Sequence, residues 1–415
     1  MNDTGWIDGV LGSARPQAIG ALLRYFRDFD LAEEAFQEAC LRALRTWPDN
    51  GPPRDPTAWL IFVGRNAAMD DVRRRAKQVA LPDEATLSDL DDAESALAER
   101  LDSGRYRDDI LRLLFICCHP ELPATQQIAL ALRIVCGLSV KQIARAFLVS
   151  VAAMEQRITR AKACIADAAV PFEAPGAAER AQRLAAVAAM IYLLFNEGYS
   201  ARSEETAQRA RLADEAIWLA RLLLRLFPAE PEIMGLTALM LLQAARMSAR
   251  FDRDGNIVLL EDQDRSLWNG QQIVEGLALI DKAVRHRRPG PYQIQAAIGA
   301  LHARAARPEE TDWAEIDLLY ANLERLQPSP VVTLNRAVAV NKVRGPAAAL
   351  EMIEPLASRL SSYFYFHGVK GALLQQLGRA GEARQSFDQA ITLANSPAEA
   401  AHIRAHLDRL DKQSA

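Results

Sequence analysis

The 415-residue sequence lacks the features of a secreted or membrane protein. No apolar run approaches the roughly 20 residues that a membrane-spanning helix needs. The first ten residues, MNDTGWIDGV, contain no basic segment followed by an apolar one, so we predict no signal sequence. We therefore expect a cytoplasmic protein with no membrane association.

Cysteine is scarce, and its number is odd. The five cysteines are Cys40, Cys117, Cys118, Cys136 and Cys164. An odd number on predicted helices argues against a disulfide framework. Adjacent cysteines also lack the Cys-x-x-Cys spacing of zinc sites, so we interpret Cys117 and Cys118 as buried thiols and expect no metal and no cofactor.

Sequence motifs of enzymes are missing as well. The six histidines are scattered, and the chain has no Gly-rich phosphate loop, Gly-x-Ser-x-Gly or His-Glu-x-x-His. The carboxylates of the insert 251–268 do not follow the spacing of a calcium-binding loop, so we interpret them as a solvated turn. A two-stranded ribbon around Asp254-Gly255-Asn256 is the other expectation for this insert. The sequence therefore predicts that the protein is not an enzyme.

The composition favours helices throughout. Leu, Ala, Arg and Glu are abundant, and alternating β-branched runs are absent, so the predicted class is all-α. The length suggests roughly two to four domains. The net charge of −4 is unlike that of a free-standing DNA-binding protein, which is usually basic. If the chain binds DNA, its cations must be locally segregated, or a partner must supply much of the affinity.

The most informative stretch is LSVKQIARAFLVSVAAMEQRITRAKACI, residues 138–165. Ser139 is a good N-cap for a first helix, and Ser150 can cap a second helix after a turn. In the second helix Met154, Ile158, Ala161 and Ile165 recur at helical steps and predict one buried stripe. Polar and cationic residues occupy its other side, as in a DNA-binding helix-turn-helix. An ordinary helical hairpin with a solvated surface is the alternative.

The N-terminal part contains two further informative helices. One, over 31–48, is expected to end before Pro48. After the loop PDNGPPRDP, a helix over 57–78 begins with apolar residues and ends with basic ones. The acidic segment 79–104 is predicted to be a linker. Helices within 105–137 are expected to break at His119-Pro120 and to end at Gly137.

Beyond residue 180 the chain contains long apolar helices. Segments 331–356 and 363–394 both read as helix, tight turn and helix, with about the period of a tetratricopeptide repeat. Such pairs stack on one another and expose a concave surface.

The order of these segments resembles the extracytoplasmic-function (ECF) class of bacterial sigma factors, the promoter-reading subunits of RNA polymerase. The matching segments are AEEAFQEACLRAL, DPTAWLIFVGRNAAMDDVRRR and LSVKQIARAFLVSVAAMEQRITRAK. The phrase LLFICCHPELP and the long helical tail resemble the subgroup with a C-terminal tetratricopeptide-like extension. Gln126-Gln127 departs from the subgroup, and Ala152-Ala153 leaves the promoter sequence open.

The resemblance implies an all-α architecture with two small promoter-binding domains, 1–78 and 105–170, joined by the acidic linker 79–104. A large helical-repeat extension, 180–415, follows and is expected to carry regulation. The implied partners are core RNA polymerase, through its clamp and flap regions, and promoter DNA, both duplex and single-stranded. A protein or peptide partner of the extension is also possible.

The resemblance and the side-chain chemistry together give three sets of candidate residues. Melted bases need aromatic or polar pockets and cations for phosphates. For the duplex upstream element the candidates are Ser150, Ala153, Gln156, Arg157, Arg160 and Lys162. For the melted element they are Asn50, Arg54, Trp59, Arg65, Asn66, Arg73, Arg74 and Arg75. For polymerase they are Glu34, Gln37 and Glu38.

Simpler interpretations stay open for some of these residues. Trp59 is at least as readily a core anchor as a stacking platform, and Glu34 with its neighbours can be a solvated surface. The alternative function is a one-component transcriptional regulator whose repeat domain senses a ligand or peptide. That alternative leaves the basic N-terminal helix without a role.

Overall fold

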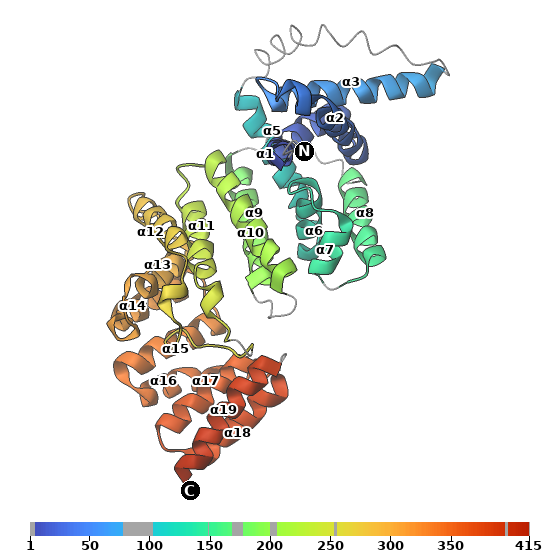
Figure 1. The fold of residues 1–415 in the computed structure, drawn as a ribbon. Helices are drawn as coiled ribbons and strands as arrows, with labels where there is room; N and C mark the ends of the chain where they lie inside the picture. Colours follow the sequence, from blue (N-terminus) through green and yellow to red (C-terminus); the bar gives the residue numbers. More distant parts are fainter. Residues whose placement is uncertain are drawn as a thin grey trace. The chain divides into compact units, whose positions relative to one another are not determined.

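The computed structural model describes residues 5–77, 103–147, 149–167, 177–199, 206–252, 255–394 and 397–414. Within these ranges every regular element is a helix, which confirms the all-α class (Figure 1). Contacts divide the chain into two compact units, Met1–Leu194 and Phe195–Ala415. The predicted linker 79–104 lies outside the described residues except for its last two positions.

The first unit begins with three helices, which we call the N-terminal helices. They are α1 (Gly5–Phe26), α2 (Phe29–Asn50) and α3 (Pro56–Lys77). Leu22, Phe36 and Leu60 are among the residues buried between them. A Cβ atom at Gly64 of α3 would lie 2.7 Å from the carbonyl oxygen of Ala35, so α2 and α3 approach at a point that requires glycine.

The expectation that the second helix ends before Pro48 is wrong. Pro48 lies inside the last turn of α2, which continues to Asn50. Proline has no N–H, so it removes one hydrogen bond of the helix, and its ring crowds the carbonyl of the residue four positions earlier. In α2 both costs fall in the last turn, two residues before the helix ends. Gly51, at φ +76°, then ends the helix and donates its N–H to the carbonyl of Trp47 at 2.9 Å.

Four more helices form what we call the HTH domain, residues 103–167. They are α5 (Ser103–Cys117), α6 (Ala124–Ile134), α7 (Val140–Ala146) and α8 (Val151–Asp167). The break at His119-Pro120 is confirmed, and Gly137 follows α6 with φ +77°. Cys117 and Cys118 are buried, as predicted, and burial raises the pKa of the Cys118 thiol to about 12. At neutral pH this thiol is therefore protonated and unreactive.

Every regular element in the described residues of the extension is a helix. Its α-helices are α9 (Ala177–Tyr199), α10 (Thr206–Leu226), α11 (Pro231–Ala244), α12 (Gly270–Val284), α13 (Pro291–Arg304), α14 (Trp313–Leu326), α15 (Pro330–Arg344), α16 (Pro346–Ile353), α17 (Phe364–Gln376), α18 (Ala380–Leu393) and α19 (Pro397–Ser414). Short 3-10 helices lie at Met247–Ala249, Arg265–Leu267, Pro308–Glu310 and Glu354–Leu356. The boundary between the two units falls inside α9. Helix α9 therefore belongs partly to the first unit.

Both predicted helix pairs near the C-terminus are confirmed as helix, tight turn and helix. They are α15 with α16 and α17 with α18. Gly345 and Gly378 make the turns with φ +86° and +72°, a conformation that favours glycine. A Cβ at Gly371 would lie 2.6 Å from the Phe387 ring, so α17 and α18 pack at a glycine contact.

The insert 251–268 does not form the expected two-stranded ribbon in its described part. Its pairing is one antiparallel bridge, between Phe251 and Ile257. Asp252 instead accepts the Asn256 N–H with its side chain at 2.8 Å, a local turn that competes with strand pairing. Arg265 then donates to the carbonyl of His302 at 2.5 Å and fixes the insert to the end of α13.

Acid is expected to destabilise the extension through two half-buried histidines, His302 and His406. Burial, with Arg246 and Arg265 nearby, lowers the pKa of His302 to about 4. Burial, with Arg409 and His402 nearby, lowers the pKa of His406 to about 4. An unfolded histidine has a pKa of about 6.5, so the unfolded chain binds more protons between pH 6.5 and 4. Each histidine is therefore expected to contribute stability that is complete above pH 6.5 and lost, by about 2 kcal/mol, toward pH 4.

Thermal unfolding of the full chain across this pH range measures the effect. Replacing both histidines, His302→Gln with His406→Gln, should flatten the acid limb of the unfolding free energy. An unchanged slope in the double variant would contradict the assignment.

Candidate nucleic-acid interface

The predicted helix-turn-helix is present in α7 and α8. Ser139 caps α7: its hydroxyl accepts the Gln142 N–H at 3.3 Å, and the Gln142 side chain accepts the Ser139 N–H at 2.8 Å. Ser150 caps α8 by accepting the Ala153 N–H at 3.1 Å. These caps satisfy backbone donors that a helix leaves unpaired at its start, and so fix where each helix begins.

The buried stripe of α8 is also the predicted one. Met154, Ile158, Ala161 and Ile165 are all buried. Ile143 and Ala144 of α7 are buried as well. Burial of this stripe holds α8 in place and determines which of its side chains remain at the surface.

The candidates for duplex binding lie on α8 and at its N-cap, and they differ in exposure and in their contacts. Ser150, Gln156 and Arg160 are exposed, and Ala153 and Arg157 are half-buried. Gln156 and Arg160 lie one turn apart, so their side chains are neighbours on the helix. Lys162 does not lie with them: its Nζ is 2.6 Å from Oδ1 of Asp30 and 2.8 Å from Oε2 of Glu33, both on α2.

The candidates for the melted element lie on α3, on the loop before it and at the last residue of α2. Asn50 and Arg54 are exposed. Arg65 is exposed, with its guanidinium 4.9 Å from the centroid of the Tyr25 ring, a cation–π contact. Asn66 is half-buried. The side chains of Arg73, Arg74 and Arg75 lie outside the described part of the structure.

Trp59 is half-buried against other tryptophans. Its ring centroid is 5.3 Å from that of Trp47, and Trp47 stacks on Trp6 at 6.4 Å. Packing against Trp47 is expected of a core anchor. Trp59 is nevertheless partly exposed.

The candidates for polymerase binding lie on α2. Glu34 and Gln37 are exposed, and Glu38 is half-buried and pairs with Arg42 at 3.2 Å. An exposed pair of this kind contributes little to stability. Glu38 and Arg42 can therefore separate and take other partners at little energetic cost.

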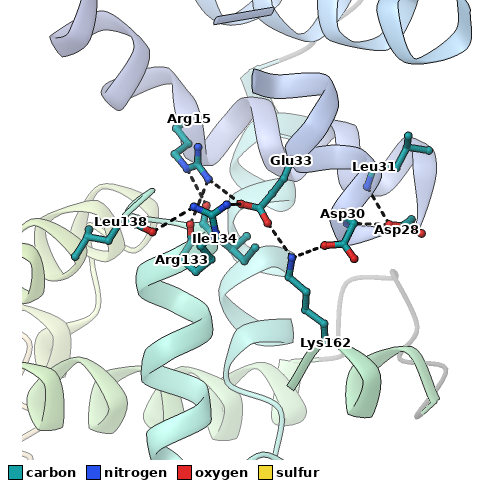
Figure 2. Close-up of polar contacts among 9 residues, drawn as sticks. All are labelled: Arg15, Asp28, Asp30, Leu31, Glu33, Arg133, Ile134, Leu138 and Lys162. Carbon is teal, nitrogen blue, oxygen red and sulfur yellow. Dashed lines mark hydrogen bonds and ion pairs between the residues drawn. The ribbon is translucent and has the colours of Figure 1, made fainter. Parts of the chain in front are cut away.

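Sequence reasoning missed Glu33, the buried neighbour of Glu34. Its carboxylate contacts Arg133 at 3.0 Å, Lys162 at 2.8 Å and Arg15 at 3.4 Å (Figure 2). We call Arg15, Asp30, Glu33, Arg133 and Lys162 the Glu33 cluster. The available signal was that Glu33 borders the apolar stripe of α2, four residues after Phe29 and three before Phe36.

Comparison with known families agrees with this geometry. Residues 11–78 match sigma-70 region 2, residues 112–165 match sigma-70 region 4, and residues 183–284 match a family of unknown function, DUF6596. The two sigma regions coincide with the N-terminal helices and with the HTH domain. The chain is an ECF-type sigma factor with a C-terminal extension.

The chain is similar along its whole length to a protein of Rhizobium meliloti. A protein of Rhizobium meliloti (strain 1021), described as uncharacterized, is 72% identical over 415 residues, 100% of this chain and 98% of that protein. Sigma-70 regions 2 and 4 imply sigma-factor function, which is to bind core RNA polymerase and promoter DNA and involves no catalysis.

Two further findings concern the described residues of the sigma factor. None of the described helices is long and apolar enough to cross a membrane. Within the same ranges, no three His, Cys, Asp or Glu side chains gather as a metal site requires.

Proposed function

We propose that the sigma factor reads two promoter elements with two separate parts of its first unit. Helix α8 binds an upstream element as duplex, and α3 with its preceding loop binds the melted downstream element. The observation that carries the proposal is the arrangement of α8. Its apolar stripe is buried, while Ser150, Gln156 and Arg160 remain exposed at the positions from which a recognition helix contacts DNA.

The second half of the proposal rests on α3. Arg65 is exposed beside Tyr25, and Asn66 follows it on the same helix. Exposed cations beside aromatic rings are the groups that bind the phosphates and bases of single strands. In this proposal Asn50, at the end of α2, and Arg54, in the loop that follows, hold a base that has left the stack.

Polymerase binding is assigned to both domains. Glu34 and Gln37 of α2 contact the clamp region, and the HTH domain contacts the flap region. The support for this assignment is the exposure of Glu34 and Gln37 on α2, a helix whose residues Ala32, Ala35, Phe36 and Ala39 are buried. The same proposal divides the chain into two promoter-binding domains, 1–78 and 105–170, the linker 79–104 between them and the extension 180–415.

The extension is assigned a regulatory role. Its helix pairs resemble tetratricopeptide repeats, which stack and bind proteins or peptides on a concave surface. In this proposal a protein or peptide partner of the extension sets the availability of the promoter-reading domains.

Reconstituted transcription tests the proposal. Purified core polymerase and the full chain are incubated with genomic DNA fragments, and the 5′ ends of the transcripts are mapped. The expected result is initiation at specific sites that require the chain. Initiation at the same sites by core polymerase alone, or no initiation with any fragment, would reject the proposal.

A further inference from the structure

The insert 251–268 contacts helices of the extension that are far apart in the sequence. In Figure 1 it is the yellow segment that follows α11. Oε2 of Glu261 in the insert lies 2.7 Å from Nζ of Lys342 on α15. Arg265 of the insert donates to the carbonyl of His302 in the last turn of α13 at 2.5 Å. The insert therefore joins α13 to α15.

Electrostatic interactions extend these contacts to two more helices. Burial and Arg409 lower the pKa of His402 on α19, and Asp262 of the insert opposes this shift. Burial lowers the pKa of Arg250, which precedes the insert, and raises the pKa of Tyr365 on α17. Arg250 and Tyr365 each oppose the shift of the other, which requires that they lie close together. The insert and Arg250 thus reach α17 and α19.

The four helices α13, α15, α17 and α19 alternate along the chain with α14, α16 and α18. In a stack of helix pairs, the first helices of successive pairs lie on one side of the stack. This side forms the concave surface on which such stacks bind peptides. The helices that the insert contacts are therefore those that would line such a surface.

The insert is anchored at both ends by arginines. The guanidinium of Arg250 lies 3.8 Å from the centroid of the Tyr199 ring and donates to the Tyr199 carbonyl at the end of α9. Arg265 donates to the carbonyl of Ala305 at 2.6 Å as well as to that of His302. Carbonyls at the end of a helix lack partners within the helix, and hydrogen bonds from a charged donor are strong. These two ends therefore stay in place when the middle of the insert moves.

The middle of the insert, residues 258–264 (VLLEDQD), is held more weakly; we call it the acidic segment. It folds on itself, since the Gln263 side chain donates to the carbonyl of Val258 at 3.2 Å. Its ion pair with α15 is exposed: the Lys342 side chain is 39% exposed and that of Glu261 is 49% exposed. Exposed pairs of this kind contribute little to stability. The acidic segment can therefore leave α15 without unfolding the helices around it.

We propose that the acidic segment is an internal ligand of the extension, and that the partner of the extension is an acidic peptide segment that binds by replacing it. The proposal rests on the proposed function, in which the extension binds a protein or peptide. Charge complementarity identifies the partner, because Lys342 of α15 faces Glu261 of the acidic segment. Nζ of Lys342 also lies 5.7 Å from the centroid of the Trp313 ring, which holds this cation in the site by a cation–π contact.

Tethering gives the acidic segment an advantage over any free peptide. A short tethered segment is present at its site at an effective concentration on the order of millimolar. A free peptide with the same sequence must compete with it. Removal of the carboxylates Glu261 and Asp262 from the chain should therefore open the site to that peptide.

Zero-length cross-linking of the full-length chain tests the proposal. A carbodiimide activates a carboxylate, and an amine in contact displaces the activated group to form an amide and release the urea. Because Nζ of Lys342 lies 2.7 Å from Glu261, the unsubstituted chain should yield an internal Glu261–Lys342 amide, identified by peptide mass mapping.

The competing probe is the peptide NIVLLEDQDR, which has the sequence of residues 256–265, with both of its ends blocked. The double variant Glu261→Gln with Asp262→Asn keeps the side-chain shapes and removes both charges. Carbodiimide should join the peptide to Lys342 of this variant at a yield about tenfold or more above that with the unsubstituted chain. Lys282, exposed on α12, should react with the peptide equally in both proteins.

A second double variant is the matched control. Glu351→Gln with Asp388→Asn removes two carboxylates from exposed positions of α16 and α18. It should behave as the unsubstituted chain does. A peptide of the same composition in scrambled order controls for charge alone and should be joined to Lys342 at the low yield in every protein.

Each outcome decides a different statement. Absence of the Glu261–Lys342 amide in the unsubstituted chain overturns the internal ligand. A yield at Lys342 that does not rise in the first double variant, or that is equal for the scrambled peptide, overturns the replacement by an acidic peptide. Failure of transcription with both cross-linking results as expected rejects the proposed function and supports the internal ligand.

Discussion

A chain that ends at Pro171 is expected to lose promoter-specific transcription with core polymerase by about tenfold or more. The cut removes the whole of α9, although the part of α9 up to Leu194 belongs to the first unit. Val187, Ile191 and Leu194 of this helix are buried, so their loss exposes apolar surface. Run-off transcription at a mapped promoter, with equal amounts of the truncated and full-length proteins, measures the loss.

A second truncation and an addition experiment identify the cause. A chain that ends at Leu194 keeps the part of α9 that belongs to the first unit and lacks the rest of the extension. The extension acts on the promoter-reading domains if two results are obtained. The chain that ends at Leu194 also loses transcription, and residues 172–415, added as a separate chain, restore part of the transcription. Full activity of both truncated proteins, with no binding between the pieces, would show that the extension has no such role.

The second large effect is a division of labour between Arg160 and Arg65. Arg160→Ala is expected to weaken binding to duplex promoter by about 1–3 kcal/mol, because an exposed recognition-helix cation loses its base or phosphate contact. Arg65→Ala is expected to leave the initial duplex complex intact and to impair retention of the melted strand. Assays of each variant on duplex and on premelted promoter templates separate the two steps.

Arg359→Ala serves as the control, since Arg359 is exposed in the extension and has no assigned role. It should behave as the unsubstituted protein on both templates. If Arg160→Ala and Arg65→Ala instead produced the same defect on both templates, the assignment of two elements to two helices would be wrong.

The helix-turn-helix could be predicted because its signals are local. The caps at Ser139 and Ser150 and the stripe from Met154 to Ile165 depend on neighbours within one or two turns, and the structure has all of them. Turns at Gly345 and Gly378 follow from the same kind of signal. Such signals determine the class of fold and the surface that α8 leaves exposed.

The remaining features depend on residues distant in sequence. Glu33 and Lys162 are separated by 129 positions. The place of Glu33 beside the apolar stripe of α2 indicates its burial, but nothing local indicates which cations it contacts. The sequence placed Lys162 with the DNA-binding candidates of α8, whereas the structure places its Nζ against Asp30 and Glu33 of α2. The prediction for Pro48 was wrong because the tendency of helices to end before a proline was applied to a residue that lies in the last turn of α2.

Footprinting of one promoter fragment with and without core polymerase tests the central claim, that the chain is a sigma factor whose DNA binding depends on polymerase. The net charge of −4 predicts weak duplex binding by the free chain, because phosphate neutralisation provides most of the affinity that is independent of sequence. The expected result is protection of an upstream duplex element and a melted downstream element when core polymerase and the chain are both present, and no protection by the chain alone. Tight, salt-sensitive protection of the duplex by the free chain would contradict the account and identify a one-component regulator instead.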